Sequence, residues 1–137
     1  MSLNGITRQP DLWAACIDMY GPADLRTLLR TTSGPGRKTN EAEYGQPGKD
    51  DDFLLSVSAI SQVDNIADPL FVYAGGNDPR VPKSESDMIV AAARKKGVPV
   101  EYMVAGNEGH SLLRPENQIE FYSRVALFLD RYVNGKK

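Results

Sequence analysis

Two short loops carry the residue types that acid–base catalysis needs. The first, Asn77-Asp78-Pro79-Arg80, follows an apolar run and carries an acid. The second, Asn107-Glu108-Gly109-His110, follows a second strand-like run and carries the only histidine of the chain. A histidine takes up and releases protons near neutral pH, and a carboxylate beside it can orient its ring. Asp78 and His110 therefore indicate half of a catalytic apparatus.

The elements that must position these loops are two strands joined by a helix. Residues 70–74 form a short apolar run and residues 100–104 a second strand-like run, each bounded by proline and glycine. Between them, Ser84 is predicted as the N-cap of a helix that ends at Gly97. Strand–helix–strand order favours a parallel sheet, whose strands all end at one edge, where such sheets bind ligands. We therefore expect Asp78 and His110 at the same rim.

The rest of the chain adds a third strand and further helices. Residues 15–19 form another apolar run, closed by Gly21-Pro22, and the spacing of leucines predicts a helix over residues 23–30. Residues 53–60 are also predicted to be helical. A long helix is predicted from Pro115 onward, with apolar residues on a repeat of three to four: Ile119, Tyr122, Val125, Ala126, Phe128, Leu129, Tyr132 and Val133. The alternation predicts an α/β fold with a short parallel sheet between two helical layers.

Three segments have weaker patterns. Residues 4–9 have little pattern of their own, while Trp13 and the leucines of the 23–30 helix are predicted to lie in the core. Residues 31–52, rich in glycine, proline and charge, are expected to form a long surface loop, either mobile or acting as a flap near the ligand edge. The three aspartates at 50–52 are interpreted as helix caps rather than metal ligands, because adjacent side chains point in different directions.

Composition and charge restrict the class of protein. The chain has 137 residues, of which 41% are hydrophobic and 25% charged, as is typical of one globular domain. A net charge of −2 argues against a nucleic-acid partner, which favours a basic surface. No apolar run approaches the ~20 residues that span a bilayer, and no signal peptide is recognisable. We expect a soluble, cytoplasmic protein without nucleic-acid or membrane partners.

The cysteine and histidine counts bear on cofactors. A single cysteine, Cys16, excludes an internal disulfide and suits a reducing compartment. One cysteine and one histidine make a zinc site of the usual kind unfavourable, and no G-x-G-x-x-G or Walker-type loop supports nucleotide binding. We therefore expect no metal and no cofactor. Cys16 lies within a predicted strand, where a thiol is usually a small buried hydrophobe rather than a nucleophile.

Taken together, the loop motifs resemble the C-terminal part of the prolyl oligopeptidase family, and most closely its acylaminoacyl-peptidase and dipeptidyl-peptidase-like enzymes. The segments that carry the resemblance are 7–15, 43–45, 52–54, 63–70, 77–82, 84–86, 107–110 and 114–117. These enzymes are α/β-hydrolase serine peptidases. The resemblance covers almost the whole chain and implies that residues 1–137 form part of a catalytic domain, without the nucleophile elbow and the earlier strands.

The resemblance also implies roles for single residues. In such hydrolases the triad runs in the order serine, acid, histidine, and Asp78 matches the acid and His110 the base. By position, Arg80 and Val81 would lie beside the substrate, a peptide or a small acyl compound. The chain departs from the family at the nucleophile, because it contains no G-x-S-x-G motif. Ser111 adjoins His110 in the sequence, and a side chain next to the base is poorly placed to donate its proton to the imidazole. Loss of a triad serine costs about a million-fold in kcat in a model protease, so we expect the chain alone to be inactive.

Two interpretations remain open. The chain is either the C-terminal portion of a serine peptidase or acyl hydrolase, or a non-catalytic α/β module used for binding or assembly. The interpretation as a non-catalytic module is supported by two general observations. A lone acid after a strand is often a turn residue, and a lone loop histidine is often an ordinary surface residue. In either case the strand at 15–19 is expected to leave an open sheet edge, which predicts a homo-oligomer formed through that edge.

Overall fold

Three parallel strands form the centre of the molecule, which a computed structural model describes over residues 1–32 and 35–136. They are β1 (Cys16–Met19), β2 (Leu70–Gly75) and β3 (Val100–Ala105), in the order β1-β2-β3. In register, Cys16 lies opposite Leu70, which lies opposite Val100. Strand β2 is buried along its whole length because it has a strand on each side.

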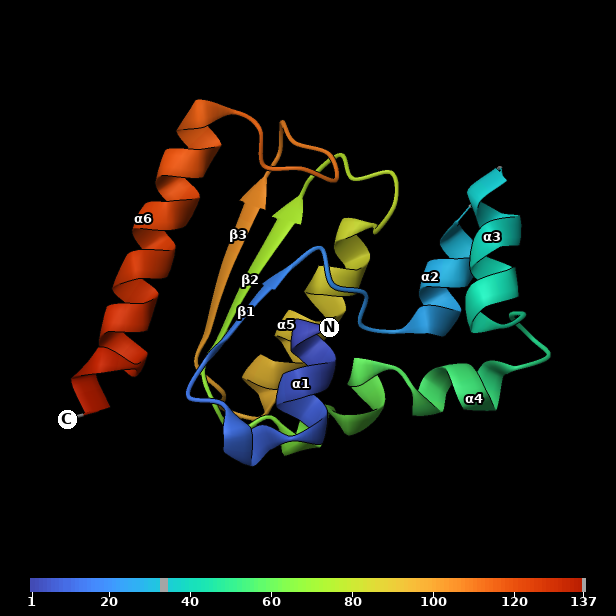
Figure 1. Ribbon diagram of the computed structural model, residues 1–137, viewed down its shortest axis with the longest axis horizontal. Helices are drawn as coiled ribbons and strands as arrows, with labels where there is room; N and C mark the ends of the chain where they lie inside the picture. The colour runs from blue at the N-terminus through green and yellow to red at the C-terminus, as the bar shows by residue number, and fades with distance from the viewer. Residues whose placement is uncertain (33–34, 137) are drawn as a thin grey trace.

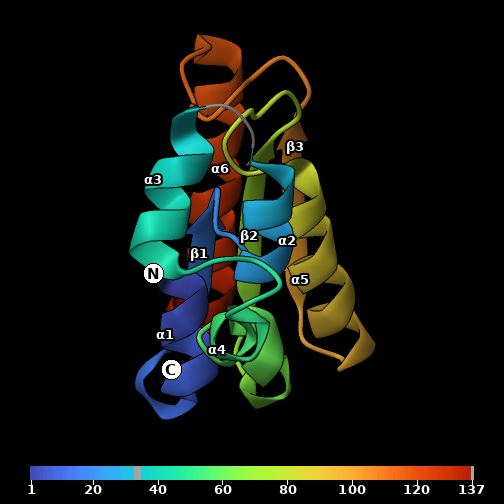
Figure 2. The same ribbon diagram turned by 90° about the vertical axis from the view of Figure 1, so that its right-hand side faces the viewer.

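Helices cover both faces of this sheet (Figures 1 and 2). The α-helices are α1 (Ser2–Arg8), α2 (Leu25–Thr31), α3 (Pro35–Tyr44), α4 (Asp51–Ser56), α5 (Lys83–Lys95) and α6 (Pro115–Tyr132). Short 3₁₀ helices are η1 (Pro10–Leu12), η2 (Ala59–Asn65) and η3 (Asn134–Lys136). Leu70 and Val72 of β2 pack into a core with α1, α5 and η2, whereas Phe71 and Tyr73 pack against α6. The predicted three-layer α/β/α arrangement is confirmed.

The core beneath α6 is aromatic. Phe71 packs edge-to-face with Phe121 and Phe128, with ring centroids 5.7 Å apart in both pairs. Tyr73 packs against Phe121 in the same manner at 5.3 Å. Such pairs contribute about 0.5–1.5 kcal/mol beyond the burial of their area. They fix α6 against β2, and the N-terminal end of α6 lies near the ends of β2 and β3 (Figure 1).

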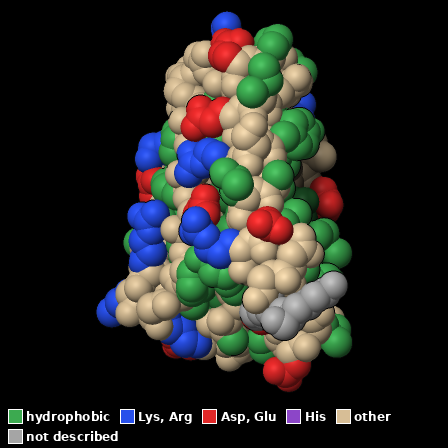
Figure 3. All heavy atoms as spheres, turned by 90° about the vertical axis from the view of Figure 1, so that its left-hand side faces the viewer, with side chains coloured by type: hydrophobic (Ala, Val, Ile, Leu, Met, Phe, Trp, Pro, Cys, Tyr) green, Lys and Arg blue, Asp and Glu red, His purple; other side chains and the backbone are tan. Residues whose placement is uncertain are grey.

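The outward face of α6 is less buried than its apolar repeat predicts. Ile119, Tyr122 and Leu127 are between 64% and 69% exposed, so Ile119 and Tyr122 do not belong to the core. Phe121, which lies between Ile119 and Tyr122 in the sequence, is buried instead. Apolar side chains on this side of the molecule are dispersed among charged ones (Figure 3). Among the described residues no helix combines the length and apolar character needed to cross a membrane.

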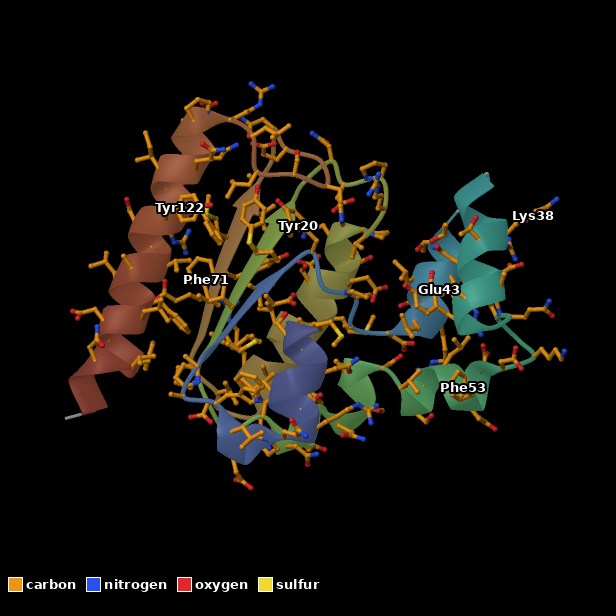
Figure 4. The ribbon with its side chains drawn as sticks, viewed as in Figure 1. Tyr20, Lys38, Glu43, Phe53, Phe71 and Tyr122 are labelled. Atoms are coloured by element: carbon orange, nitrogen blue, oxygen red, sulfur yellow. The ribbon has the colours of Figure 1, made fainter. Side chains whose placement is uncertain are left out.

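The prediction of a long surface loop over residues 31–52 is wrong, because most of that segment is helical. Helix α3 is largely exposed and packs on α2, and an ion pair between Arg37 and Glu41, one turn apart, supports it. An exposed helix has no apolar stripe to reveal it in the sequence. Residues 33 and 34 of the predicted loop lie outside the described residues. Helices α2, α3 and α4 project away from the sheet (Figure 1), with Lys38, Glu43 and Phe53 on α3 and α4 marked in Figure 4.

Asp50 occupies the N-cap position of α4, as predicted, and Asp51 lies in the first turn, but the Asp50 side chain makes no cap hydrogen bond. The carboxylate of Asp50 accepts the backbone N–H of Gln46 at 2.8 Å and makes no cap bond to α4. Asp51 accepts the N–H of Gly48 at 2.8 Å and pairs with Arg30 of α2. These carboxylates therefore stabilise the turn that precedes the helix and tie it to α2.

Other boundaries also differ from the predictions. Residues 4–9 lie mostly within α1, whose Leu3 and Ile6 are buried, and two apolar residues are too few to predict a helix. Trp13 is 47% exposed rather than part of the core. The helix predicted over 53–60 is two elements, α4 and η2, separated by a bend. Helix α5 begins at Lys83 after Pro82, so Ser84 is not its N-cap.

Candidate active site

Asp78 and His110 meet at the end of the sheet, each on the loop that follows its strand. Oδ2 of Asp78 lies 2.8 Å from Nδ1 of His110. A carboxylate only accepts hydrogen bonds, so Nδ1 carries the proton of this bond and Nε2 can act on another group. The carboxylate is 2% exposed and the imidazole 31% exposed, so the pair joins a buried acid to a base that solvent reaches.

The backbone after β2 holds the Asp78 carboxylate in place. Its second oxygen, Oδ1, accepts the N–H of Arg80 at 2.8 Å and the N–H of Val81 at 3.0 Å. An Asx-type turn of this kind forms locally, which explains why an aspartate after a strand could be recognised in the sequence. The Arg80 side chain is exposed and Val81 half-buried, and their predicted contact with a substrate stays a prediction.

The two loops approach each other so closely that the end of β2 must be glycine. A Cβ on Gly75 would lie 1.9 Å from the carbonyl oxygen of Gly109. The N–H of Asn77 donates to the carbonyl of Glu108 at 2.9 Å, and its side-chain amide donates to the carbonyl of Gly106 at 2.7 Å. The acid loop and the histidine loop are therefore hydrogen-bonded to each other next to the Asp78–His110 pair.

Tyr20, which directly follows β1 (Figure 4), lies beside the imidazole of His110 and was not predicted. Its ring centroid is 4.7 Å from that of His110 and 5.3 Å from that of Tyr73, which it meets edge-to-face. Burial raises the pKa of Tyr20, so its hydroxyl stays protonated at neutral pH. Tyr20 has φ of +59°, which is unfavourable for a bulky residue. No local pattern predicts such a conformation.

Glu108 is the second residue that the sequence did not single out for a role. It is 4% exposed, and its carboxylate accepts hydrogen bonds from the segment that connects His110 to α6. Ser111 donates its hydroxyl to Glu108 at 3.1 Å. Its carbonyl oxygen accepts the Tyr73 hydroxyl at 3.2 Å. Ser111 is therefore engaged in holding the loop.

Cys16 is buried, as the sequence predicts, and burial raises the pKa of its thiol to about 12. A thiol with so high a pKa remains protonated and is a poor nucleophile. Among the described residues, no group of three or more histidine, cysteine, aspartate or glutamate side chains is arranged to hold a metal ion.

A groove of about 590 Å³ runs beside β1, on the side that faces away from β2. Apolar side chains supply most of its lining, among them Ile6, Trp13, Cys16 and Ile17. Asp78 and His110 do not line it. The groove beside β1 and the acid–base pair on the loops after β2 and β3 are therefore separate features.

Comparison with known proteins places this arrangement in a family. The sequence model of the prolyl oligopeptidase family matches residues 1–136. Dipeptidyl aminopeptidase BIII of Pseudoxanthomonas mexicana is 36% identical over 98% of this chain and 20% of its own length. Dipeptidyl peptidase family member 6 of Caenorhabditis elegans is 31% identical over 98% of this chain and 19% of its own length. This chain thus spans about a fifth of the length of these relatives.

Solved structures show the same fold. Acylaminoacyl peptidase of Pyrococcus horikoshii superposes with a TM-score of 0.86 at 19% sequence identity, over 96% of this chain and 22% of that one. An acylaminoacyl peptidase in complex with Z-Gly-Gly-Phe-chloromethyl ketone gives a TM-score of 0.85 at 20% identity, over 95% of this chain and 22% of that one. The helices and the short parallel sheet described above correspond to part of an α/β-hydrolase fold.

Proposed function

Because the chain belongs to the prolyl oligopeptidase family of serine peptidases, we propose that Asp78 and His110 are the acid and the base of a Ser-Asp-His triad. The observation that carries this proposal is the 2.8 Å contact between Oδ2 of Asp78 and Nδ1 of His110. It is supported by the order of the residues, since the acid follows one strand and the histidine the next.

In this mechanism the imidazole of His110 moves the protons. Nε2 removes the proton of a serine hydroxyl as that oxygen attacks a peptide or acyl carbonyl, and then delivers the proton to the leaving group. Asp78 keeps the proton of the neutral ring on Nδ1 and stabilises the imidazolium that forms. Arg80 and Val81, beside the acid, are proposed to contact the substrate. The serine and the oxyanion hole must come from polypeptide outside these 137 residues, so the chain alone is inactive.

A fluorophosphonate probe tests this proposal, because it labels only an activated serine. The 1–137 chain is expected to remain unlabelled. A longer polypeptide that includes a G-x-S-x-G serine ahead of this sequence is expected to be labelled, and substitution His110→Ala or Asp78→Asn should slow labelling at least about 1,000-fold. Glu116→Ala, on an exposed residue of α6, serves as the control and should label normally. If the His110→Ala variant were labelled as fast as the unsubstituted longer polypeptide, the proposal would be overturned.

A second candidate function, an assembly module, is favoured by the free edge of β1. Within the described residues β1 pairs only with β2, and the apolar groove runs beside its other edge. Exposed strand edges pair readily with further strands. We propose that two copies of the isolated chain associate through β1, which light scattering at micromolar concentration would detect as a dimer or larger species. A monodisperse monomer would contradict this association.

A further inference from the structure

Glu108 is a nearly fully buried carboxylate, 4% exposed, two residues before His110. It lies at the beginning of the loop that leads from β3 through His110 to α6. A buried charge is unfavourable unless hydrogen-bond donors surround it. The hydrogen-bond donors to the Glu108 carboxylate therefore show which segments this side chain connects.

Four donors converge on its two oxygens. Oε1 accepts the backbone N–H of Leu113 at 2.9 Å, that of Arg114 at 2.7 Å and the side-chain amide of Asn117 at 3.2 Å. Oε2 accepts the hydroxyl of Ser111 at 3.1 Å. Leu113 and Arg114 immediately precede α6, so the carboxylate also lies at the positive end of that helix. These bonds, the one from the Arg114 backbone foremost, lower the pKa of Glu108 and keep it ionised.

The geometry of these bonds closes the loop on itself. The side chain of Glu108 reaches forward past His110 to residues 111, 113 and 114, so His110 lies inside a hydrogen-bonded ring. The carbonyl of Glu108 accepts the N–H of Asn77, next to Asp78 in the acid loop. One residue thus joins the histidine loop to α6 through its side chain and to the acid loop through its backbone.

We propose that Glu108 is a positioning residue, whose carboxylate holds the 108–114 loop in the conformation that brings Nδ1 of His110 to Asp78. Without this acceptor, the N–H groups of Leu113 and Arg114 lose their partner, and the loop gains conformational freedom. The importance of this role for catalysis rests on the proposed function. The positioning itself is testable in the chain alone.

Three variants separate the effects of the acceptor, the charge and the helix terminus. Glu108→Ala removes all four contacts. Glu108→Gln keeps one oxygen for Leu113 and Arg114, and its amide can donate to the Ser111 hydroxyl, so it preserves most of the ring without the charge. Glu116→Ala removes an exposed acid from the first turn of α6 and leaves the Glu108 contacts intact.

Proton NMR of His110 supplies the readout, because the chain has only this histidine. A ring proton held between nitrogen and a carboxylate resonates far downfield and exchanges slowly with water. We expect this Nδ1 resonance in the wild type, Glu108→Gln and Glu116→Ala, and its loss in Glu108→Ala at unchanged helical circular dichroism. Its persistence in Glu108→Ala would overturn the inference. Its absence from the wild type would instead overturn the proposed acid–base pair.

If Glu108→Ala does not fold, Ser111→Ala and Asn117→Ala test the same ring one donor at a time. Each should accelerate solvent exchange of the Nδ1 proton at least about tenfold, and unchanged exchange in both would overturn the inference. In a polypeptide that carries the serine, Glu108→Ala should lower kcat about 100-fold at unchanged KM, as expected for a misplaced catalytic group. Glu108→Gln should retain kcat within about tenfold.

Discussion

The loops after β2 and β3 and the free edge of β1 differ in how completely their groups are paired. At the loops, the carboxylates of Asp78 and Glu108 are buried, and each of their oxygens accepts at least one hydrogen bond. Beside β1, a groove of about 590 Å³ has an apolar lining, and Trp13 is 47% exposed. The two loops thus hold hydrogen-bonded carboxylates, while β1 pairs with no second strand among the described residues.

The largest expected effect comes from the core beneath the ordered loops. Phe71→Ala empties the space between Phe121 and Phe128 under β2 and should lower the free energy of unfolding by about 3–5 kcal/mol. Ile119→Ala, on the exposed face of α6, should change it by no more than about 0.5 kcal/mol. Urea denaturation measures both. Similar losses in the two variants would show that α6 is not packed as described.

The close approach of the two loops predicts a smaller, more local effect. Gly75→Ala places a methyl group 1.9 Å from the Gly109 carbonyl, so the histidine loop must move. We expect a loss of about 1–3 kcal/mol in stability together with loss of the downfield His110 proton. Gly106→Ala is the matched control, because its Cβ would meet nothing within 4 Å. A well-tolerated Gly75→Ala would contradict the described contact between the loops.

The free edge can be blocked without disturbing the sheet. The N–H of Cys16 donates to the carbonyl of Pro69, just before β2, and the N–H of Tyr20 donates to the carbonyl of Tyr73. The alternate N–H of Ile17 therefore points to the open side. Ile17→Pro removes this donor and should weaken self-association at least about tenfold, which sedimentation velocity would measure. Val104→Pro, at the other edge on β3, should leave association unchanged. Equal effects of the two substitutions would rule out β1 as the contact.

The smallest effect concerns pH. The pKa of Glu108 is lower in the folded than in the unfolded chain, where a glutamate has a pKa of about 4.3. Its carboxylate therefore stabilises the folded chain fully at pH values above that unfolded pKa. This contribution is lost as the pH falls through the pKa of the folded state. Glu108→Gln lacks the titrating group. The stability difference between wild type and Glu108→Gln should therefore shrink between pH 7 and pH 3, as followed by urea denaturation. A difference that stays constant over this range would contradict the role of the charge.

The sequence predicted the elements whose signals are local. Strand β2 is a buried run that ends at Gly75, whereas the edge strand β3 is mostly half-buried and is followed by Gly106. The acid and the histidine lie in the loops that follow these two strands, so their shared rim could be inferred from strand order. The long apolar repeat of α6 was equally clear, although its exact face was not. Two motifs separated by one helix and one strand therefore sufficed to place the centre of the candidate site.

The features that the sequence did not predict depend on contacts between residues far apart in the chain. Tyr20 reaches His110 only because its backbone adopts a positive φ after β1. Glu108 belongs to a predicted motif, yet its role depends on where α6 begins relative to the loop. Helix α3 has no buried stripe and resembles a loop in composition. Each of these features is determined by tertiary packing, which no local pattern of residues records.

The most direct test of the account is the tautomer of the single histidine. Asp78→Asn keeps an oxygen for the N–H groups of Arg80 and Val81 but turns an amide donor toward His110. Nitrogen-15 NMR of the neutral imidazole should show protonated Nδ1 and unprotonated Nε2 in the wild type, and the opposite tautomer in Asp78→Asn. Identical imidazole spectra for the two proteins would show that Asp78 does not hold His110.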